Sequence, residues 1–350
     1  MKIIGCDYHP SYQQIAWCDP DTGETGDARL THGNGEAEQF YRSQAGPVRV
    51  GMETVGNAGW FERLLAGLGH ELWIGDAAQI RSLVVRRQKT DRRDARHLLE
   101  LLLSNRFPRI WVPSPEVRDA RQLLLHRHKL VRMRVAVKNQ LQHLALNQGV
   151  QRKRKLWTRE GRRALQALPL TGWTATRRQD LLQLLDQFDT RIAQLDGEVF
   201  KVAAAHPTAR LLQSHPGIGP VVSLAFVLTL GPWQRFAKAK KVVSYLGLNQ
   251  REHSSGGRQK LGSISKQGNG FLRSLLVEAS LNAARRDPQL RRAYRRLAAR
   301  KHTALARVMV ARKLAMRLYW MLRENRPYRP VAPRPVVAMP ESPSHPVVAV

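Results

Sequence analysis

Cysteine is nearly absent from this sequence of 350 residues. The two cysteines, Cys6 and Cys18, lie in strand-like runs and have no CxxC spacing. Disulfide frameworks and cysteine-bound zinc both need several cysteines at short, regular spacings. We therefore expect neither, and we expect both thiols to be reduced and buried.

Long apolar runs and nucleotide-binding motifs are also lacking. No stretch approaches the roughly 18 uncharged apolar residues that a membrane-spanning helix needs, and Asp7 interrupts the N-terminus before a signal-type run develops. No Walker loop occurs, no GxGxxG follows a strand, and the histidines have no HExxH spacing. The sequence thus predicts a soluble cytoplasmic protein without a membrane partner, and it gives no support for ATP, NAD or zinc.

Acidic residues are scarce relative to basic ones. The chain has 27 Asp and Glu against 58 Lys and Arg, a formal charge of +31 and a pI near 11.3. About 43% of the residues are hydrophobic, so the chain can bury a real core and is no basic tail. Such an excess of positive charge indicates a polyanionic partner, and nucleic acid is the first candidate.

The first 80 residues alternate between short strands and helices. Period-2 patterns and turn residues predict strands near residues 2–9, 13–20, 27–33, 48–54 and 70–77, with helices near 36–44 and 58–69. Strands joined by tight turns, followed by alternating helix and strand, are typical of a mixed α/β fold. The ribonuclease H-like topology is one member of that class.

The rest of the chain has helical periodicity. Residues 114–149 combine an apolar face with an Arg- and Lys-rich face. A later seam runs through Leu181, Leu184, Leu185, Phe188, Ile192, Leu195 and Val199. This seam is compatible with a coiled-coil dimer or with a helical hairpin inside one chain.

A PGIG turn follows near residue 216. Its Gly217 and Gly219 resemble the turn of a helix-hairpin-helix, whose amides can hold a backbone phosphate, although a plain glycine turn explains them too. Two further cationic helical stretches precede Asn325. Beyond Asn325 the prolines are dense, and we expect a disordered tail.

Four carboxylates suit a divalent metal site. Asp7 and Glu53 end predicted strands, and Asp91 and Asp94 lie three residues apart at the start of a predicted helix. Hard oxygen ligands are those that Mg²⁺ requires, and metal ions stabilise phosphodiester displacement. Each carboxylate alone has a simpler explanation as a turn residue or a helix-dipole partner. In this order and in so basic a chain, the metal site is the better interpretation.

A second candidate site lies in residues 251–276. Ser254 and Ser255 precede two glycines, and a serine nucleophile that attacks a phosphate needs open approach and cationic surroundings. Taken alone, the two serines and two glycines are better explained as a flexible turn that binds phosphate passively. The surrounding cations, expected to bind nucleic acid, are Arg251, Arg258, Lys260, Lys266 and Arg273.

Taken together, these motifs closely resemble the DEDD transposases of insertion-sequence family 110, the bridge-RNA-guided recombinases. The resemblance rests on Asp7, METVG with Glu53, KTDRRDA with Asp91 and Asp94, and then PGIGPVVS, YLGLN and SSGGRQKLGSISKQGNGFLRSLL. It covers roughly residues 1–325.

The resemblance implies a RuvC-like domain in residues 1–125, a basic helical and coiled-coil region in 126–205, and a mostly helical transposase domain in 206–325. Residues 326–350 remain as the Pro-rich tail. The four carboxylates would hold Mg²⁺, and the nucleophilic serine falls on Ser255, with Ser254 as its neighbour.

The implied activity is cutting and rejoining of DNA through a 5′-phosphoserine linkage. Donor and target duplex DNA, a non-coding bridge RNA, and a homodimer or homotetramer are the implied partners, in the nucleoid of a bacterial or archaeal cell. Two alternatives stay open: a RuvC-like, metal-dependent junction nuclease without a covalent intermediate, and a nucleic-acid binder without enzymatic activity.

Overall fold

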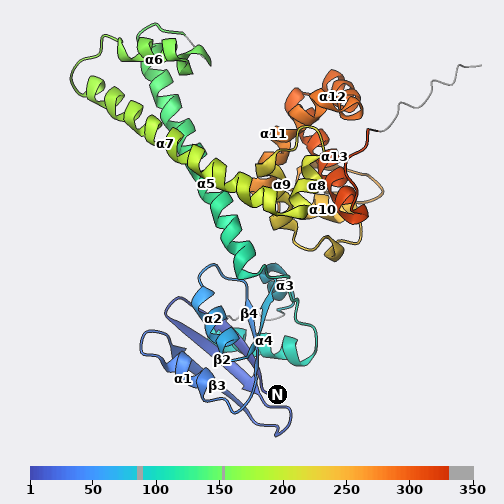
Figure 1. The fold of residues 1–350 in the computed structure, drawn as a ribbon. Coiled ribbons are helices and arrows are strands. Elements are labelled where there is room, and N and C mark those ends of the chain that lie inside the picture. The colour runs from blue at the N-terminus through green and yellow to red at the C-terminus, as the bar shows by residue number, and fades with distance from the viewer. Residues whose placement is uncertain (85–89, 152–153, 331–350) are drawn as a thin grey trace, which may run out of the picture. The chain divides into compact units, whose positions relative to one another are not determined.

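The computed structural model describes residues 1–84, 90–151 and 154–330. It contains two compact units, Met1–Pro113 and Ser114–Val350, drawn in blue to teal and in teal to red in Figure 1. Residue 125, where we expected the first domain to end, lies inside the continuous helix α5 (Pro115–Asn147). The N-terminal unit is mixed α/β and the second unit is mostly helical, as the sequence predicts.

A five-stranded sheet forms the centre of the N-terminal unit, in the order β3-β2-β1-β4-β5. Strands β1, β2 and β3 pair antiparallel, and β4 and β5 continue the sheet parallel to β1. The tight turns permit the antiparallel pairs, while the helix before β5 returns the chain for a parallel pair. The strands are β1 (Ile3–Tyr8), β2 (Tyr12–Cys18), β3 (Thr25–Thr31), β4 (Arg49–Glu53) and β5 (Glu71–Gly75).

Each face of this sheet is covered by helices. Because strand residues alternate between faces, Ile4 and Cys6 enter one core with Tyr41 of α1 and Phe61 of α2, while the other face of β1 packs against α4. The expectation for cysteine holds for Cys6, which is buried, but Cys18 at the end of β2 is only half-buried. The helices are α1 (Glu36–Arg42), α2 (Gly59–Gly67), α3 (Ala77–Ser82) and α4 (Asp91–Leu103).

Gly5 allows α4 to lie directly on β1. A Cβ atom at Gly5 would lie 2.3 Å from the carbonyl oxygen of Ala95 and 2.4 Å from the amide nitrogen of Leu99. Both are backbone atoms of α4 and cannot rotate away. The small residue in β1 therefore sets the distance between the sheet and the helix that begins at Asp91.

The second unit begins with a helical hairpin of α5 and α7 (Gly172–Ala205), which lie side by side in Figure 1. Leu141 and Leu144 of α5 share a buried cluster with Leu181 and Leu185 of α7. The hydrophobic seam is thus used within one chain, although Leu184 points outward and is exposed. The 3-10 turn η1 (Arg154–Trp157) and α6 (Arg159–Gln166) connect the two long helices.

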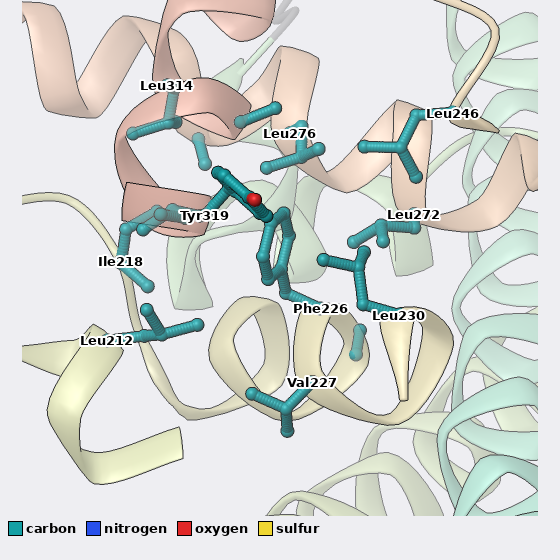
Figure 2. Close-up of a cluster of buried hydrophobic side chains, with 14 of the residues drawn as sticks. Leu212, Ile218, Phe226, Val227, Leu230, Leu246, Leu272, Leu276, Leu314 and Tyr319 are labelled. Carbon is teal, nitrogen blue, oxygen red and sulfur yellow. The ribbon is translucent and has the colours of Figure 1, made fainter. Parts of the chain in front are cut away.

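The remaining helices surround α9, in which every residue from Ser223 to Leu230 is buried. Figure 2 shows Phe226 of α9 in the same apolar cluster as Leu276 and Tyr319, and the Tyr319 hydroxyl donates to the carbonyl of Phe236 at 2.6 Å. The elements are α8 (Pro207–Gln213), α9 (Pro220–Leu230), η2 (Trp233–Arg235), α10 (Ala239–Tyr245), β6 (Gln250–Glu252), β7 (Leu261–Ile264), α11 (Gly270–Arg286), α12 (Pro288–Arg300) and α13 (Thr303–Glu324). None of the helices in the described ranges is both long and apolar enough to cross a bilayer.

The first residues of the predicted disordered tail have partners elsewhere in the second unit. The Tyr328 amide donates to Ser214 Oγ at 2.9 Å, the Tyr328 hydroxyl donates to Asp287, and its ring lies 4.6 Å from that of His215. An aromatic residue with these partners can be held in place despite the prolines that follow. Residues 331–350, the rest of the predicted tail, lie outside the described residues.

Candidate metal centre and serine hairpin

Asp7 and Glu53 lie level with one another at the ends of neighbouring strands. The parallel register between β1 and β4 ends with Cys6 opposite Met52, and Asp7 and Glu53 are the next residues on the two strands. Alternation along a strand puts Asp7 on the same face as Gly5, which is the face that α4 covers. The sheet thus directs both carboxylates toward the side occupied by α4.

The start of α4 supplies the other two carboxylates. Thr90 is the N-cap, and its hydroxyl accepts from the Arg93 amide at 3.4 Å. Asp91 and Asp94 occupy the first turn, where the exposed amides and the helix dipole favour negative charge. The capping residue therefore fixes where α4 begins and so places both carboxylates in its first turn.

Asp7 and Asp91 come together with a histidine that we did not predict. One ligand atom from each of Asp7, His9 and Asp91 lies within 4.8 Å of the other two. His9 Nε2 is 3.2 Å from Asp7 Oδ2 and 3.6 Å from Asp91 Oδ2. The Tyr12 hydroxyl donates to Asp91 Oδ2 at 2.7 Å, and its ring stacks on His9.

The electrostatics of Asp7 suit a cation. Burial raises the pKa of Asp7, and the nearby carboxylates of Asp94 and Asp91 raise it further, while His9 opposes the shift. Carboxylates that disfavour one another's charge are relieved by a bound divalent ion. The donor set of carboxylate oxygens and one imidazole nitrogen fits such an ion.

Glu53 and Asp94 are less directly placed than Asp7 and Asp91. Glu53 Oε1 accepts from Arg81 at 3.0 Å and is not in the close group. Asp94 is near enough to shift the pKa of Asp7. The pair with Arg81 occupies Oε1 of Glu53, and Oε2 is the carboxylate oxygen left to ligate an ion.

Asp27 ties α4 to the sheet from another strand. Its Oδ2 accepts from Arg92 at 2.7 Å and from Arg96 at 2.8 Å, and the Arg92 hydrogen bond, with that of Arg96, holds the pKa of Asp27 low against its desolvation. Two arginines of the acidic helix are thus engaged with β3 and hold α4 in register. Arg92 therefore has a structural partner inside the unit.

The serine loop is a β-hairpin with a glycine turn. Ser255 and Arg258 form an antiparallel bridge around Gly256 and Gly257, whose φ angles are +57° and +74°. Positive φ at both central residues is what the tightest hairpin turns require, and glycine adopts it without strain. The turn holds Ser255 at the exposed tip of the β6–β7 hairpin.

The two serines differ in their partners. Ser254 Oγ donates to Glu252 Oε1 at 2.7 Å and accepts from the Lys260 amide at 3.2 Å, and the Ser254 hydrogen bond lowers the pKa of Glu252. Within the described ranges, the hydroxyl of Ser255 has no hydrogen-bond partner. Ser254 thus supports the hairpin, and Ser255 has the freer hydroxyl.

The predicted cations and glycines have distinct positions. Arg251 and Arg273 donate to backbone carbonyls, those of Ser265 at 3.4 Å and Leu246 at 3.0 Å. The other three cations of the loop, Arg258, Lys260 and Lys266, are exposed.

The PGIG glycines join α8 to α9. A Cβ atom at Gly217, whose φ is +92°, would lie 2.5 Å from the Ala283 amide nitrogen, whereas one at Gly219 meets nothing within 4 Å. Close packing against α11 therefore explains Gly217.

His9 and Tyr12 are the site residues that the sequence analysis missed. Both follow Asp7 within five residues, in DYHPSY, where β1 turns into β2. A histidine and a tyrosine in the turn after an acidic strand end were the available signal. Their contacts with Asp91 arise because α4 packs against β1 and β2.

Two family models match the chain. A DEDD transposase model of the IS110 group matches residues 4–148, a span that includes all four predicted carboxylates. The model described as the Transposase IS116/IS110/IS902 family matches residues 209–295, a span that includes Ser255.

Curated relatives extend over most of the chain. A probable family 20 transposase of Pseudomonas aeruginosa is 29% identical over 309 residues, covering 84% of this chain and 89% of its own. The transposase for insertion sequence element IS1111A of Coxiella burnetii is 28% identical, covering 80% and 77%. The pilin gene-inverting protein of Moraxella bovis is 31% identical over 144 residues, covering 39% and 45%. With both of its units matched in this way, the chain belongs to the IS110 group of DEDD transposases and is a DNA transposase.

Proposed function

We propose that this transposase cuts and rejoins DNA strands through a phosphoserine intermediate on Ser255, assisted by Mg²⁺ at the carboxylates of Asp7, Glu53, Asp91 and Asp94. The observation that carries the proposal is the presence of two separate chemical sites in one chain. An acidic centre lies in the N-terminal unit, and an accessible serine lies on a basic hairpin of the second unit. A hydrolytic nuclease would need only the first.

The proposed serine step is a displacement at the phosphorus of a DNA phosphodiester. Ser255 Oγ attacks the phosphorus of a DNA phosphodiester, an Oγ–P bond forms, and the bond from phosphorus to the 3′ oxygen breaks. The serine proton passes through water to the 3′ oxygen, which leaves as a hydroxyl, and the 5′ phosphate stays on the protein. A 3′ hydroxyl from another strand then attacks the same phosphorus and releases Ser255, so the bond energy is conserved.

The surroundings of Ser255 support this role. The glycine turn leaves the hydroxyl open to a bulky phosphate, and Arg258 and Lys260 are exposed beside it. Cationic groups that face the extra charge on phosphorus lower the barrier of such a displacement. The bond from Ser254 to Glu252 keeps the neighbouring serine occupied.

The acidic centre would hold the metal ion. Bound Mg²⁺ would neutralise charge on the phosphate and orient it. Asp7 and Asp91 are the side chains that already converge, and Tyr12 and His9 hold them in position. Glu53 would complete the set through the carboxylate oxygen that Arg81 does not occupy.

The wider assembly follows the resemblance to bridge-RNA-guided recombinases. The strand order of the N-terminal unit, with three antiparallel strands followed by two parallel ones, supports a RuvC-like fold. Strand exchange between donor and target duplexes requires at least two copies of the chain, and four for two duplexes. A bridge RNA would select both DNA sites by base pairing, and the net charge of +31 accommodates RNA and DNA together.

A covalent-adduct assay tests the serine mechanism. The full chain is incubated with its RNA and a labelled DNA duplex, denatured and resolved by electrophoresis. Ser255→Ala should abolish the labelled protein band, whereas Ser254→Ala should keep it at a reduced level because only the hairpin is weakened. A band that survives in Ser255→Ala, or disappears only in Ser254→Ala, would refute the assignment.

A metal-dependent junction nuclease is the second candidate. The acidic centre of Asp7, His9 and Asp91 favours it, since those side chains assemble within one unit. This function predicts cleaved DNA without a covalent band in the same assay, and equal cleavage by Ser255→Ala. Loss of cleavage in Asp7→Asn together with retention in Ser255→Ala would therefore support it.

A further inference from the structure

A strongly cationic surface covers α12 and the end of α11. Eight exposed Arg or Lys side chains occur within 17 residues: Arg285, Arg286, Arg291, Arg292, Arg295, Arg296, Arg300 and Lys301. This set is called the α12 surface below. It is separate in sequence from the serine hairpin and from every residue assigned above.

The face of α12 opposite its arginines packs against the core. Leu290 is buried, and Tyr294 and Leu297 pack against the main apolar cluster of the unit. At about 100° per residue, the arginines from Arg291 to Arg300 occupy the opposite half of the helix. These arginines are therefore exposed along one side of the helix, and the Arg291 guanidinium also donates to the carbonyl oxygen of Arg285.

Among the residues that the structure describes, no carboxylate pairs with the α12 surface. The acidic residue in this stretch, Asp287, is 1% exposed and is engaged by Arg317 at 2.7 Å and by Tyr328. In the part of the chain that the structure describes, none of the eight cations takes part in a salt bridge. Most other close ion pairs of the second unit, such as Arg134 with Asp189, join neighbouring helices.

The charge arrangement works against the helix itself. Arg291 and Arg295, Arg292 and Arg296, and Arg296 and Arg300 are like-charge pairs at i and i+4, each of which destabilises a helix. A polyanion bound along the surface would reverse that repulsion. Packing of the apolar face of α12 against the core does not explain why its exposed face carries so many arginines.

We infer that the α12 surface binds the phosphate backbone of duplex DNA. Charge complementarity identifies a polyanion, and Tyr294, the one aromatic residue of α12, packs inward, so the surface offers no ring on which unpaired bases could stack. A cationic stripe without stacking groups suits a paired duplex, whose bases are already stacked. The choice of DNA rests on the transposase function but not on the serine mechanism or on RNA guidance.

The salt dependence of binding tests this inference. Fluorescence anisotropy of the full chain with a random-sequence 25-bp duplex (about two to three turns at 10–10.5 bp per turn) is measured in EDTA, over a series of salt concentrations. Each phosphate contact contributes about −0.9 to the slope of log K against log salt. The variant Arg291→Gln/Arg292→Gln/Arg295→Gln/Arg296→Gln should therefore lower the magnitude of the slope by about 3 to 4.

Two controls separate local contacts from net charge. The fourfold Arg→Lys variant at the same positions keeps the charge and should keep most of the slope. Arg159→Gln/Arg163→Gln/Lys240→Gln/Lys241→Gln removes the same charge from exposed positions elsewhere and should leave the slope nearer to wild type. Gln and Lys support helices about as well as Arg, and circular dichroism checks that α12 is retained.

Three outcomes would overturn the inference: an unchanged slope in the fourfold Gln variant, an equal loss in the distant control, or weakened binding of single-stranded RNA with unchanged binding of the duplex. Failure of the proposed serine mechanism gives a different pattern. The covalent band would then be absent from the wild type while the salt slope still depended on α12.

Discussion

Gly5→Ala is expected to disrupt the acidic centre without changing any of its side chains. The new methyl group would lie 2.3 Å from the Ala95 carbonyl oxygen and 2.4 Å from the Leu99 amide nitrogen. Carbon atoms in favourable contact lie about 3.5 Å from their neighbours, so α4 must retreat by roughly 1 Å. Overpacking of this kind costs about 1–3 kcal/mol of stability.

The displacement reaches the metal site because Asp91 begins the same helix. A shift of about 1 Å in a catalytic group can cost on the order of 10²-fold in rate. Binding of Mn²⁺, followed by its electron paramagnetic resonance signal, should weaken in Gly5→Ala, and recombination should fall further than stability alone explains.

Gly51→Ala is the matched control. The nearest atoms to a Cβ there are side-chain atoms of Leu102, at 2.7 to 3.0 Å, near the end of α4 that lies farthest from Asp91, and no backbone atom of α4 is among them. It should therefore disturb Mn²⁺ binding much less than Gly5→Ala. Equal Mn²⁺ affinity in Gly5→Ala and the wild type would refute the claim that the close approach at Gly5 positions the site.

Two further predictions concern single side chains. Burial lowers the pKa of His215 to about 4 from an ordinary 6.5, so the unfolded chain takes up a proton first as the pH falls, and the free energy of unfolding should drop by about 2 kcal/mol between pH 7 and 5. His215→Gln should lose that part of the pH dependence in urea titrations, and an unchanged dependence would contradict the assignment. Tyr12→Phe removes the 2.7 Å hydrogen bond to Asp91 and should weaken Mn²⁺ binding about 10-fold, with Tyr245→Phe, which lies on α10, as the control.

The strands and the acidic residues were predictable because their signals are local. Period-2 alternation located all five strands of the sheet, and the spacing of Asp91 and Asp94 agreed with the helix predicted to begin there. The glycines after Ser255 predicted a turn for the same reason, since positive φ is a property of single residues. Each of these inferences needed only neighbours in the chain.

The early residues of the tail and the partners of each carboxylate were not predictable in that way. Proline density argued for disorder from residue 326, but Tyr328 bonds to Asp287 and Ser214, which lie 41 and 114 residues away. Likewise Glu53 pairs with Arg81, 28 residues later. Composition describes a segment by itself and carries no information about the partner that holds it.

The sequence by itself determined the chemistry of this transposase: a chain with a large excess of positive charge, four carboxylates at element ends, and a serine before two glycines. Only the tertiary structure decided which of these groups meet. His9 and Tyr12 join Asp91 because β1 pairs antiparallel with β2 and because Gly5 admits α4 close to the sheet. The sequence fixes the side-chain type at each position, but a functional site needs particular side chains to lie close together. Packing between segments far apart in the chain decides which side chains those are.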